Sequence, residues 1–226
     1  MQPTVLPWPG YFNLMCNADD FVFHDDVLLS RPSWQTRNRL LFAGKAEWVS
    51  LPTMHVGDDQ RISETKVIMD KKWKDMLRRR VSQNYSRHPH FREAAEIIEI
   101  LLDHTDDCLS SRTETCIRYI AGKLGLHPRI HRSSDLRIDG HRSDRLIAFC
   151  RYFNADIYLS PVGSADYLAA DSFAEHAPSR LAFQEYAPQP YPQANCPEFV
   201  SHLSIVDLVA NVGWESARAY VISGSL

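Results

Sequence analysis

The sequence predicts an α/β fold, with a layered sheet and a helical insertion at about residues 71–125. Short apolar runs typical of strands alternate with amphipathic segments of helical period, which is the pattern of helices packed on a sheet. Between residues 71 and 125 three amphipathic segments follow one another without a strand between them. A length of 226 residues fits a single domain over 1–226, with a possible helical subdomain at 71–125.

The N-terminal part begins with a loop stiffened by three prolines and Gly10, and a short helix is expected from Tyr11 onward. Residues 21–23 form a buried apolar strand that ends in His24-Asp25-Asp26. Open α/β sheets place their ligands at such strand ends, so this cluster is the first candidate site. Residues 40–51 have the pattern of a hairpin turning at Ala43-Gly44-Lys45, and a short strand with a turn is expected at 62–69.

The helical insertion is expected to contain helices at 71–83, 91–103 and 111–124. In the first, Trp73, Met76, Leu77 and Val81 fall on one stripe. The third opens on Ser111-Arg112-Thr113-Glu114, which has the form of a capping box, and Gly125 follows its end. The second half then predicts strands at 130–133, 155–159 and 181–186, helices at 143–153, 166–170 and 205–212, and a proline-rich loop at 188–197.

Composition narrows the class of protein. The formal net charge of −3 argues against a general nucleic-acid binder. The five cysteines are widely spaced without a Cys-x-x-Cys pair, so we expect reduced thiols and no metal site. No apolar run approaches the ~18–20 residues of a membrane span, and no signal peptide is recognisable. These features predict a cytoplasmic protein without a transmembrane segment.

Several blocks in a fixed order resemble the WbqC-like protein family. They begin with Gln2-Pro3, Leu6-Pro7-Trp8, Gly10-Tyr11-Phe12, Phe21-Val22, Asp25-Asp26-Val27, Trp34 and Arg37-Asn38-Arg39. They continue with Ser133-Ser134-Asp135-Leu136, Arg145-Leu146-Ile147, Ala155–Ser160, Asp166-Tyr167-Leu168, Phe183–Tyr186, Tyr191-Pro192-Gln193, Phe199 and Leu203–Gly213. Met1 and Thr4 stand where the family often has His and Asn or Tyr. The resemblance implies a role in bacterial surface-polysaccharide or natural-product biosynthesis, where some members are described as glycyl transferases acting on amino sugars.

A second, weaker analogy concerns the loop Pro7-Trp8-Pro9-Gly10-Tyr11-Phe12. It is similar to the Pro-x-x-Gly-His loop of nucleotidylyltransferases, with Tyr11 in place of the second His. The analogy favours a Rossmann-like layered sheet and does not support adenylyl-transfer chemistry.

Amide formation on an amino sugar requires a base, donors for a developing oxyanion and a site for the activated acyl group. We expect His24 to be the base and Asp25 or Asp26 to orient it. The alternative interpretation is that the two carboxylates cap the following segment and His24 is an ordinary strand-end residue. Both interpretations place the three residues at the end of the strand at 21–23.

Further polar residues are candidates for substrate binding, although each could equally belong to an ordinary loop or turn. Arg37 offers a fork for carboxylate or phosphate and Asn38 an amide. Serines at strand ends could hold phosphate through backbone N–H groups, and a row of amides and phenols suits sugars or nucleotides. The full set is Gln2, Tyr11, Arg37, Asn38, Ser133, Ser134, Ser160, Asp166, Gln184, Tyr186, Tyr191 and Gln193.

The sequence therefore predicts a transferase that acylates or aminoacylates an amine on a nucleotide-linked sugar or related small molecule. The activated donor stays open among aminoacyl-tRNA, acyl-CoA, a carrier-protein thioester and an amino acid with ATP, and no motif indicates a cofactor. One alternative is a metal-dependent hydrolase using Asp20, His24, Asp25 and Asp26. Another is a non-catalytic partner within a biosynthetic complex.

Overall fold

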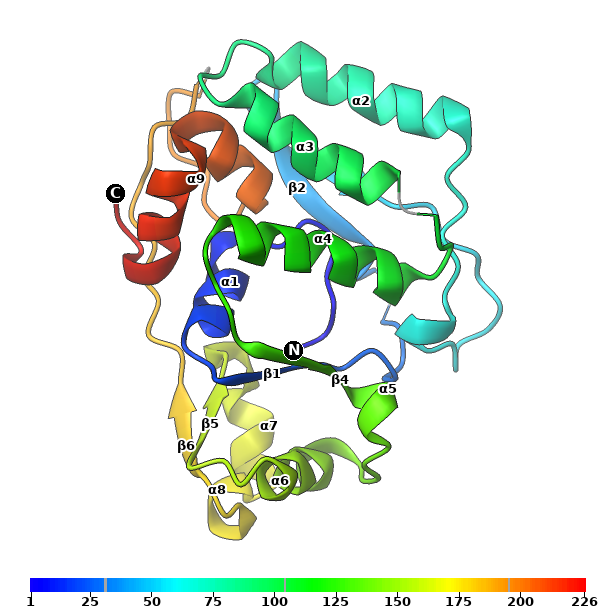
Figure 1. The fold of residues 1–226 in the computed structure, drawn as a ribbon, viewed down its shortest axis with the longest axis vertical. Coiled ribbons are helices and arrows are strands. Elements are labelled where there is room, and N and C mark those ends of the chain that lie inside the picture. The colour runs from blue at the N-terminus through cyan, green and yellow to red at the C-terminus, as the bar shows by residue number, and fades with distance from the viewer. Residues whose placement is uncertain (31, 104, 195) are drawn as a thin grey trace.

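The computed structural model describes residues 1–30, 32–103, 105–194 and 196–226. Figure 1 shows the order of the elements. The helices are α1 (Pro9–Cys16), α2 (Lys71–Tyr85), α3 (Phe91–Leu102), α4 (Leu109–Lys123), α5 (Ser133–Leu136), α6 (Arg142–Tyr152), α7 (Ala165–Ala170), α8 (Phe173–His176) and α9 (Ile205–Ser223). The strands are β1 (Asp20–Phe23), β2 (Arg37–Phe42), β3 (Lys45–Ser50), β4 (Arg129–Arg132), β5 (Ile157–Ser160) and β6 (Arg180–Phe183), with short 3₁₀ turns at Ile62–Glu64 and Val162–Ser164.

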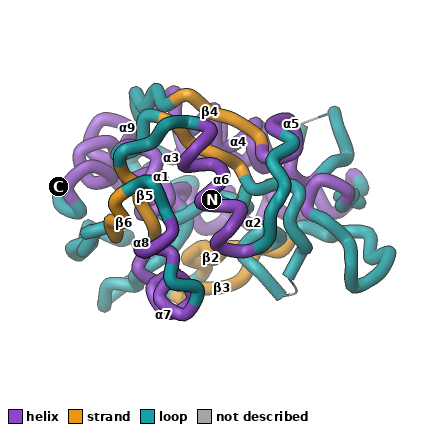
Figure 2. Tube along the Cα trace, turned by 90° about the horizontal axis from the view of Figure 1, so that it is seen from below, coloured by secondary structure: helices purple, strands orange, loops and turns teal. Residues whose placement is uncertain are grey.

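The strands confirm a mixed α/β fold but do not confirm a Rossmann-like layered sheet. Within the described ranges they pair in three separate two-stranded sheets: β1 with β4 in parallel, β2 with β3 antiparallel and β5 with β6 in parallel. Seen from below, β4 and the β2–β3 hairpin lie on opposite sides of the molecule (Figure 2). The hairpin turns where expected, because Ala43 and Gly44 both adopt the positive φ that a tight two-residue turn requires.

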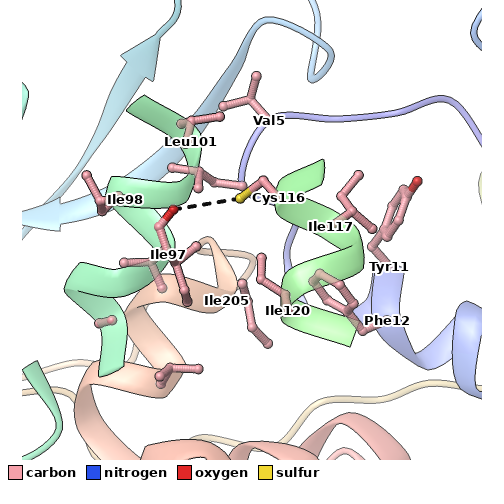
Figure 3. Packing of buried hydrophobic residues seen from close by; sticks show 14 of the residues in the cluster. Val5, Tyr11, Phe12, Ile97, Ile98, Leu101, Cys116, Ile117, Ile120 and Ile205 are labelled. Atoms are coloured by element: carbon pink, nitrogen blue, oxygen red, sulfur yellow. Dashed lines mark hydrogen bonds between the residues drawn. The ribbon is translucent and has the colours of Figure 1, made fainter. Parts of the chain in front are cut away.

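A large hydrophobic core holds the upper half of the molecule together. The apolar stripe of α3 packs between α4 and α9, as Ile97, Ile98, Ile117, Ile120 and Ile205 show in Figure 3. The thiol of Cys116 is part of this packing and lies 3.8 Å from the carbonyl oxygen of Ile97. These helices owe their stability to burial of one face, since short helices are marginal in water by themselves.

A smaller second core lies at the other end of the molecule, below β1 and β4 (Figure 1). It joins α6, α7 and α8 to the β5–β6 sheet. Its buried members are Leu146, Ile147, Phe149, Cys150, Leu168 and Phe173. Leu146, Ile147 and Cys150 form the inward face of α6, and Phe153, which follows the helix, is partly buried against the same core.

Three expected elements differ from the structure. The segment predicted at 62–69 contains the expected turn but no continuous strand. Ile62–Glu64 forms a 3₁₀ turn, in which the Glu64 carboxylate accepts a hydrogen bond from the backbone N–H of Arg61, and Lys66 and Val67 form only isolated bridges. Helix α4 starts at Leu109, before the predicted capping box, since the Glu114 carboxylate is buried and pairs with Arg132. Helix α9 continues to Ser223, past a kink at Gly213, whose φ of 73° lets the chain turn without steric cost.

None of the described helices combines the length and the apolar character needed to cross a lipid bilayer. No cysteine pair in the described residues forms a disulfide, and Cys116 and Cys150 are buried as expected.

Candidate functional site

The candidate site begins at the carboxyl ends of β1 and β4. The two strands run parallel with Phe23 opposite Arg132, so the residues that follow them meet at one edge. Here His24-Asp25-Asp26 faces Ser133-Ser134, which opens α5. The pairing brings together predicted site residues that lie more than 100 positions apart in the sequence.

The carboxylate of Asp25 is fully engaged with α5. It accepts hydrogen bonds from the Ser133 hydroxyl at 3.1 Å, the Ser134 backbone N–H at 3.0 Å and the Ser134 hydroxyl at 2.6 Å. Asp25 is therefore a helix cap supplied from a distant segment. The backbone N–H of Ser134, which had been expected to help hold phosphate, is thus occupied by Asp25, as are both serine hydroxyls.

Asp26 forms an ion pair with Arg145 of α6, with N–O distances of 2.9 and 2.5 Å, and accepts a further bond from Ser133. Both partners are largely buried, with side chains 14% and 18% exposed. Although burial tends to raise the pKa of Asp26, the hydrogen bonds from Arg145 and Ser133 prevail and hold that pKa below its ordinary value. Asp26 thus joins β1 to α6.

His24 is arranged differently from the two carboxylates beside it. Within the described residues its ring makes no hydrogen bond, so neither Asp25 nor Asp26 orients it, and its closest ring contact is an edge-on packing against Phe149 at 5.3 Å. Burial lowers the pKa of His24 well below its ordinary value, and the N-terminal amino group and Arg145 lower it further. Asp26 raises this pKa but does not outweigh them. The imidazole is consequently neutral at physiological pH and open to a ligand.

Two cavities meet at His24. The first, with a volume of about 700 Å³, lies between α1, β1, α6 and the β5–β6 sheet, and we call it the acidic cavity. Its lining includes Asp19, Asp156 and Glu185, which form no ion pair within the described residues. Asp20 also lines it but is neutralised by Arg129 at 2.6 Å and bonded to His131 at 2.8 Å.

The second cavity, of about 640 Å³, lies between the N-terminal loop, the start of β2 and the segment that follows β5, and we call it the aromatic cavity. No described Asp, Glu, Lys or Arg lines it. Its rings and amides are those of Gln2, Trp8, Tyr11, Trp34, Gln35, Asn38, Tyr158, Tyr167 and His202. Five of the described residues line both cavities and form a shared wall: Met1, His24, Leu146, Tyr158 and Pro161.

The N-terminal loop that forms one side of the aromatic cavity is fixed by Asn38. Its amide nitrogen donates to the carbonyls of Val5 at 3.0 Å and Leu6 at 2.8 Å, and its oxygen accepts from the Arg39 N–H. These bonds hold Leu6 at a positive φ of 45°. The predicted substrate ligand Asn38 thus has its amide hydrogens committed to shaping the loop.

Gly10 is required at the start of α1 because the Trp8 ring folds back over it. A Cβ at this position would lie 2.2 Å from two carbons of that ring. Pro9 precedes it at the first helical turn, where a missing N–H costs nothing. The proline-glycine pair therefore places the Trp8 ring against the aromatic cavity.

Other predicted ligands lie around the two cavities or outside them. Tyr11 and Gln2 line the aromatic cavity, and the Tyr11 hydroxyl donates to the Gln2 carbonyl at 3.1 Å. Gln184 lines the acidic cavity and donates to Gly10 and Asn13, each at 2.8 Å. Four lie outside both: Arg37 stacks on Trp48, Ser160 is buried at the end of β5, Asp166 is exposed on α7, and Tyr186 packs against Trp8.

The structure separates Tyr191 and Gln193 from His24. Their side chains donate to the buried carboxylate of Asp207 at 2.7 and 3.2 Å, and Tyr85 donates to its other oxygen at 2.8 Å. Burial raises the pKa of Asp207, although these donors oppose the shift. The cluster ties the proline-rich loop and α2 to the start of α9, which is a structural function.

The hydrolase alternative needed Asp20 beside His24, Asp25 and Asp26. Asp20 lies at the opposite end of β1 and is bonded to Arg129 and His131 instead. Among the described residues, no group of three or more His, Cys, Asp or Glu side chains is arranged to hold a metal ion.

Comparison with known proteins identifies the family of the chain. A model of the WbqC-like protein family matches residues 2–219. The chain belongs to the WbqC-like protein family. It is also similar to the uncharacterized protein Rv1507c of Mycobacterium tuberculosis (strain ATCC 25618 / H37Rv), with 29% identity over 218 residues that cover 96% of this chain and 94% of the relative. No solved structure matches the chain.

Several residues of the candidate site were not among the predicted site residues. Trp34, Arg145, Tyr158 and Tyr167 stand inside blocks that carry the family resemblance, so that signal could have found them. Gln35 gave no local signal, because an isolated amide residue is most often structural.

Proposed function

We propose that this protein is a cytoplasmic transferase that acylates, or aminoacylates with a group such as glycyl, an amine on a nucleotide-linked sugar or related small molecule. The observation that carries the proposal is the position of His24 in the wall shared by two cavities. A transferase needs two substrates to meet at one reacting group, and a site between two cavities provides that geometry. Surface-polysaccharide or natural-product biosynthesis is the pathway class that family membership supports.

His24 would take the proton from the attacking amine. The new bond forms between the amine nitrogen and the acyl carbon, the bond from that carbon to its leaving group breaks, and the proton passes through His24 to the leaving group. The lowered pKa keeps the imidazole in its unprotonated form, which is the form that accepts a proton, and it favours release of that proton to the leaving group.

The acidic cavity suits the amine substrate. Asp19, Asp156 and Glu185 give its wall a negative charge that attracts an ammonium group before it loses its proton. In this proposal Asp25 and Asp26 act indirectly: they fix α5 and α6 against the end of β1 and so hold the backbone from which His24 projects.

The test is transfer by the purified chain with amino-sugar nucleotides and each donor class in turn, with the amide product detected by mass spectrometry. We expect His24→Gln to lower the rate about 100-fold or more, the usual contribution of a positioned base. The exposed His127, which lines neither cavity, gives the matched control His127→Gln, with an unchanged rate expected.

Equal rates for the wild type and His24→Gln would contradict the role of His24. Absence of any amide product with all four donor classes would contradict the transferase and favour a non-catalytic partner in a biosynthetic complex.

A further inference from the structure

The aromatic cavity has the surface of a stacking site. Trp34 is 45% exposed and Tyr167 is 37% exposed, and both line it, Trp34 from the segment before β2 and Tyr167 from α7. Trp8 and His202 form a stacked pair there, with ring centroids 4.8 Å apart and planes 29° from parallel. Large rings left exposed in a cavity indicate a flat aromatic ligand, because stacking recovers the apolar contact that water does not provide.

Gln35 adds a hydrogen-bonding edge to this surface. Gln35 is 6% exposed, its amide nitrogen donates to the side-chain oxygen of Gln2, and its amide oxygen is buried without a partner among the described residues. A buried acceptor without a partner is unfavourable unless a ligand satisfies it. An amide next to exposed rings is the combination that recognises a nucleobase, whose edge carries both donors and acceptors.

We infer that the aromatic cavity binds the nucleobase of a nucleoside phosphate. The inference rests on the proposed function, since it assigns the nucleotide part of one substrate to the aromatic cavity and leaves the acidic cavity to the amine. The absence of described carboxylates from the lining fits a phosphate-bearing ligand. Arg37 and Arg39 alternate with Asn38 along β2 and add positive charge on the outer face of that strand.

The same base chemistry could come from two sources. A nucleotide-linked sugar acceptor would bring its base into the aromatic cavity, and so would an adenine-bearing donor such as coenzyme A or the 3′ end of a tRNA. AMP and coenzyme A test the adenine-bearing donor, and UMP, CMP, dTMP and GMP test the nucleotide-linked sugar, without a transfer assay.

The experiment is isothermal titration calorimetry of the full chain with UMP, CMP, dTMP, AMP, GMP and coenzyme A. We expect at least one base class to bind, and Trp34→Leu and Tyr167→Leu each to raise its Kd about 10-fold, as loss of one stacking ring does. Tyr152 is 61% exposed and lines neither cavity, so Tyr152→Leu is the matched control and should leave the Kd unchanged.

Gln35→Glu tests the polar edge. A carboxylate only accepts hydrogen bonds, so this variant should change the ranking of the bases in favour of those that present an amino group. Failure of every ligand to bind at millimolar concentration, or an equal loss in Tyr152→Leu, would overturn the inference. Because binding is measured without transfer, nucleotide binding by a chain that forms no amide would sink the proposed function and leave the nucleobase site standing.

Discussion

The upper region around Asp207 and the region of the two cavities around His24 contain similar polar residues but differ in whether the protein itself satisfies their hydrogen bonds. In the upper region, the buried Asp207 accepts hydrogen bonds from Tyr85, Tyr191 and Gln193, so its carboxylate is satisfied by the protein. Between the two cores, His24 makes no side-chain hydrogen bond within the described residues, and the oxygen of Gln35 is unpaired. A polar group that the fold satisfies stabilises the fold, whereas one left open is available to a ligand.

The same difference separates the two kinds of predicted site residue. At the ends of β1 and β4, Ser133 and Ser134 donate hydrogen bonds to the carboxylate of Asp25. These polar groups therefore hold α5 in place and are not available to a ligand. His24 directly precedes Asp25 in the sequence, and its side chain lines both cavities. Neighbours in one sequence motif can therefore divide into a structural part and a ligand-facing part.

The largest effect is expected from a substitution of Asp207 in the upper region. Asp207→Ala leaves two buried phenol hydroxyls and one amide without their acceptor, so we expect the free energy of unfolding to fall by about 3 kcal/mol or more. Urea denaturation followed by circular dichroism measures it. A loss below about 1 kcal/mol would mean that water replaces the carboxylate as the hydrogen-bond acceptor. The polar groups around Asp207 would then be as accessible as those of the cavities.

A smaller effect on the free energy of unfolding is expected when one tyrosine of each region, Tyr191 or Tyr167, is replaced by phenylalanine. Tyr191→Phe removes one donor to a buried carboxylate and should lower the free energy of unfolding by about 1–3 kcal/mol. Tyr167→Phe removes an exposed hydroxyl from the aromatic cavity and should change stability by less than about 0.5 kcal/mol. Equal changes in the two variants, measured by the same urea transitions, would remove the distinction.

The smallest effect concerns the pH dependence of stability. The pKa of His24 is lowered in the folded state, so the unfolded chain binds its proton more readily once the pH falls below about 6.5. The wild type should therefore lose stability relative to His24→Gln as the pH decreases from about 6.5, by at most about 1.4 kcal/mol per pH unit.

Urea transitions of both proteins between pH 7.5 and 5 give this difference, in which the titration of all other groups cancels. A difference that stays constant over that range would show that His24 titrates normally in the folded protein. The imidazole would then be solvated rather than enclosed between the cavities.

Local patterns in the sequence predicted most of the elements. The apolar stripe at 91–102, the strand at 21–23 and the turn at Ala43-Gly44 each depend on neighbours a few residues away, and the structure contains all three. The continuous strand expected at 62–69 does not form, because the Glu64 carboxylate caps a local turn by accepting from the backbone N–H of Arg61. The capping box expected at Ser111–Glu114 does not form, because the Glu114 carboxylate accepts a hydrogen bond from the distant Arg132.

The sequence by itself determined the mixed α/β composition and the presence of a polar cluster after the strand at 21–23. Only the tertiary structure decided which polar residues are free. Asp25 finds Ser134 across 109 positions of the chain, and Asp26 finds Arg145 across 119. Such pairings depend on how sheets and helices pack, so no local pattern could show that the carboxylates are occupied while His24 faces two cavities.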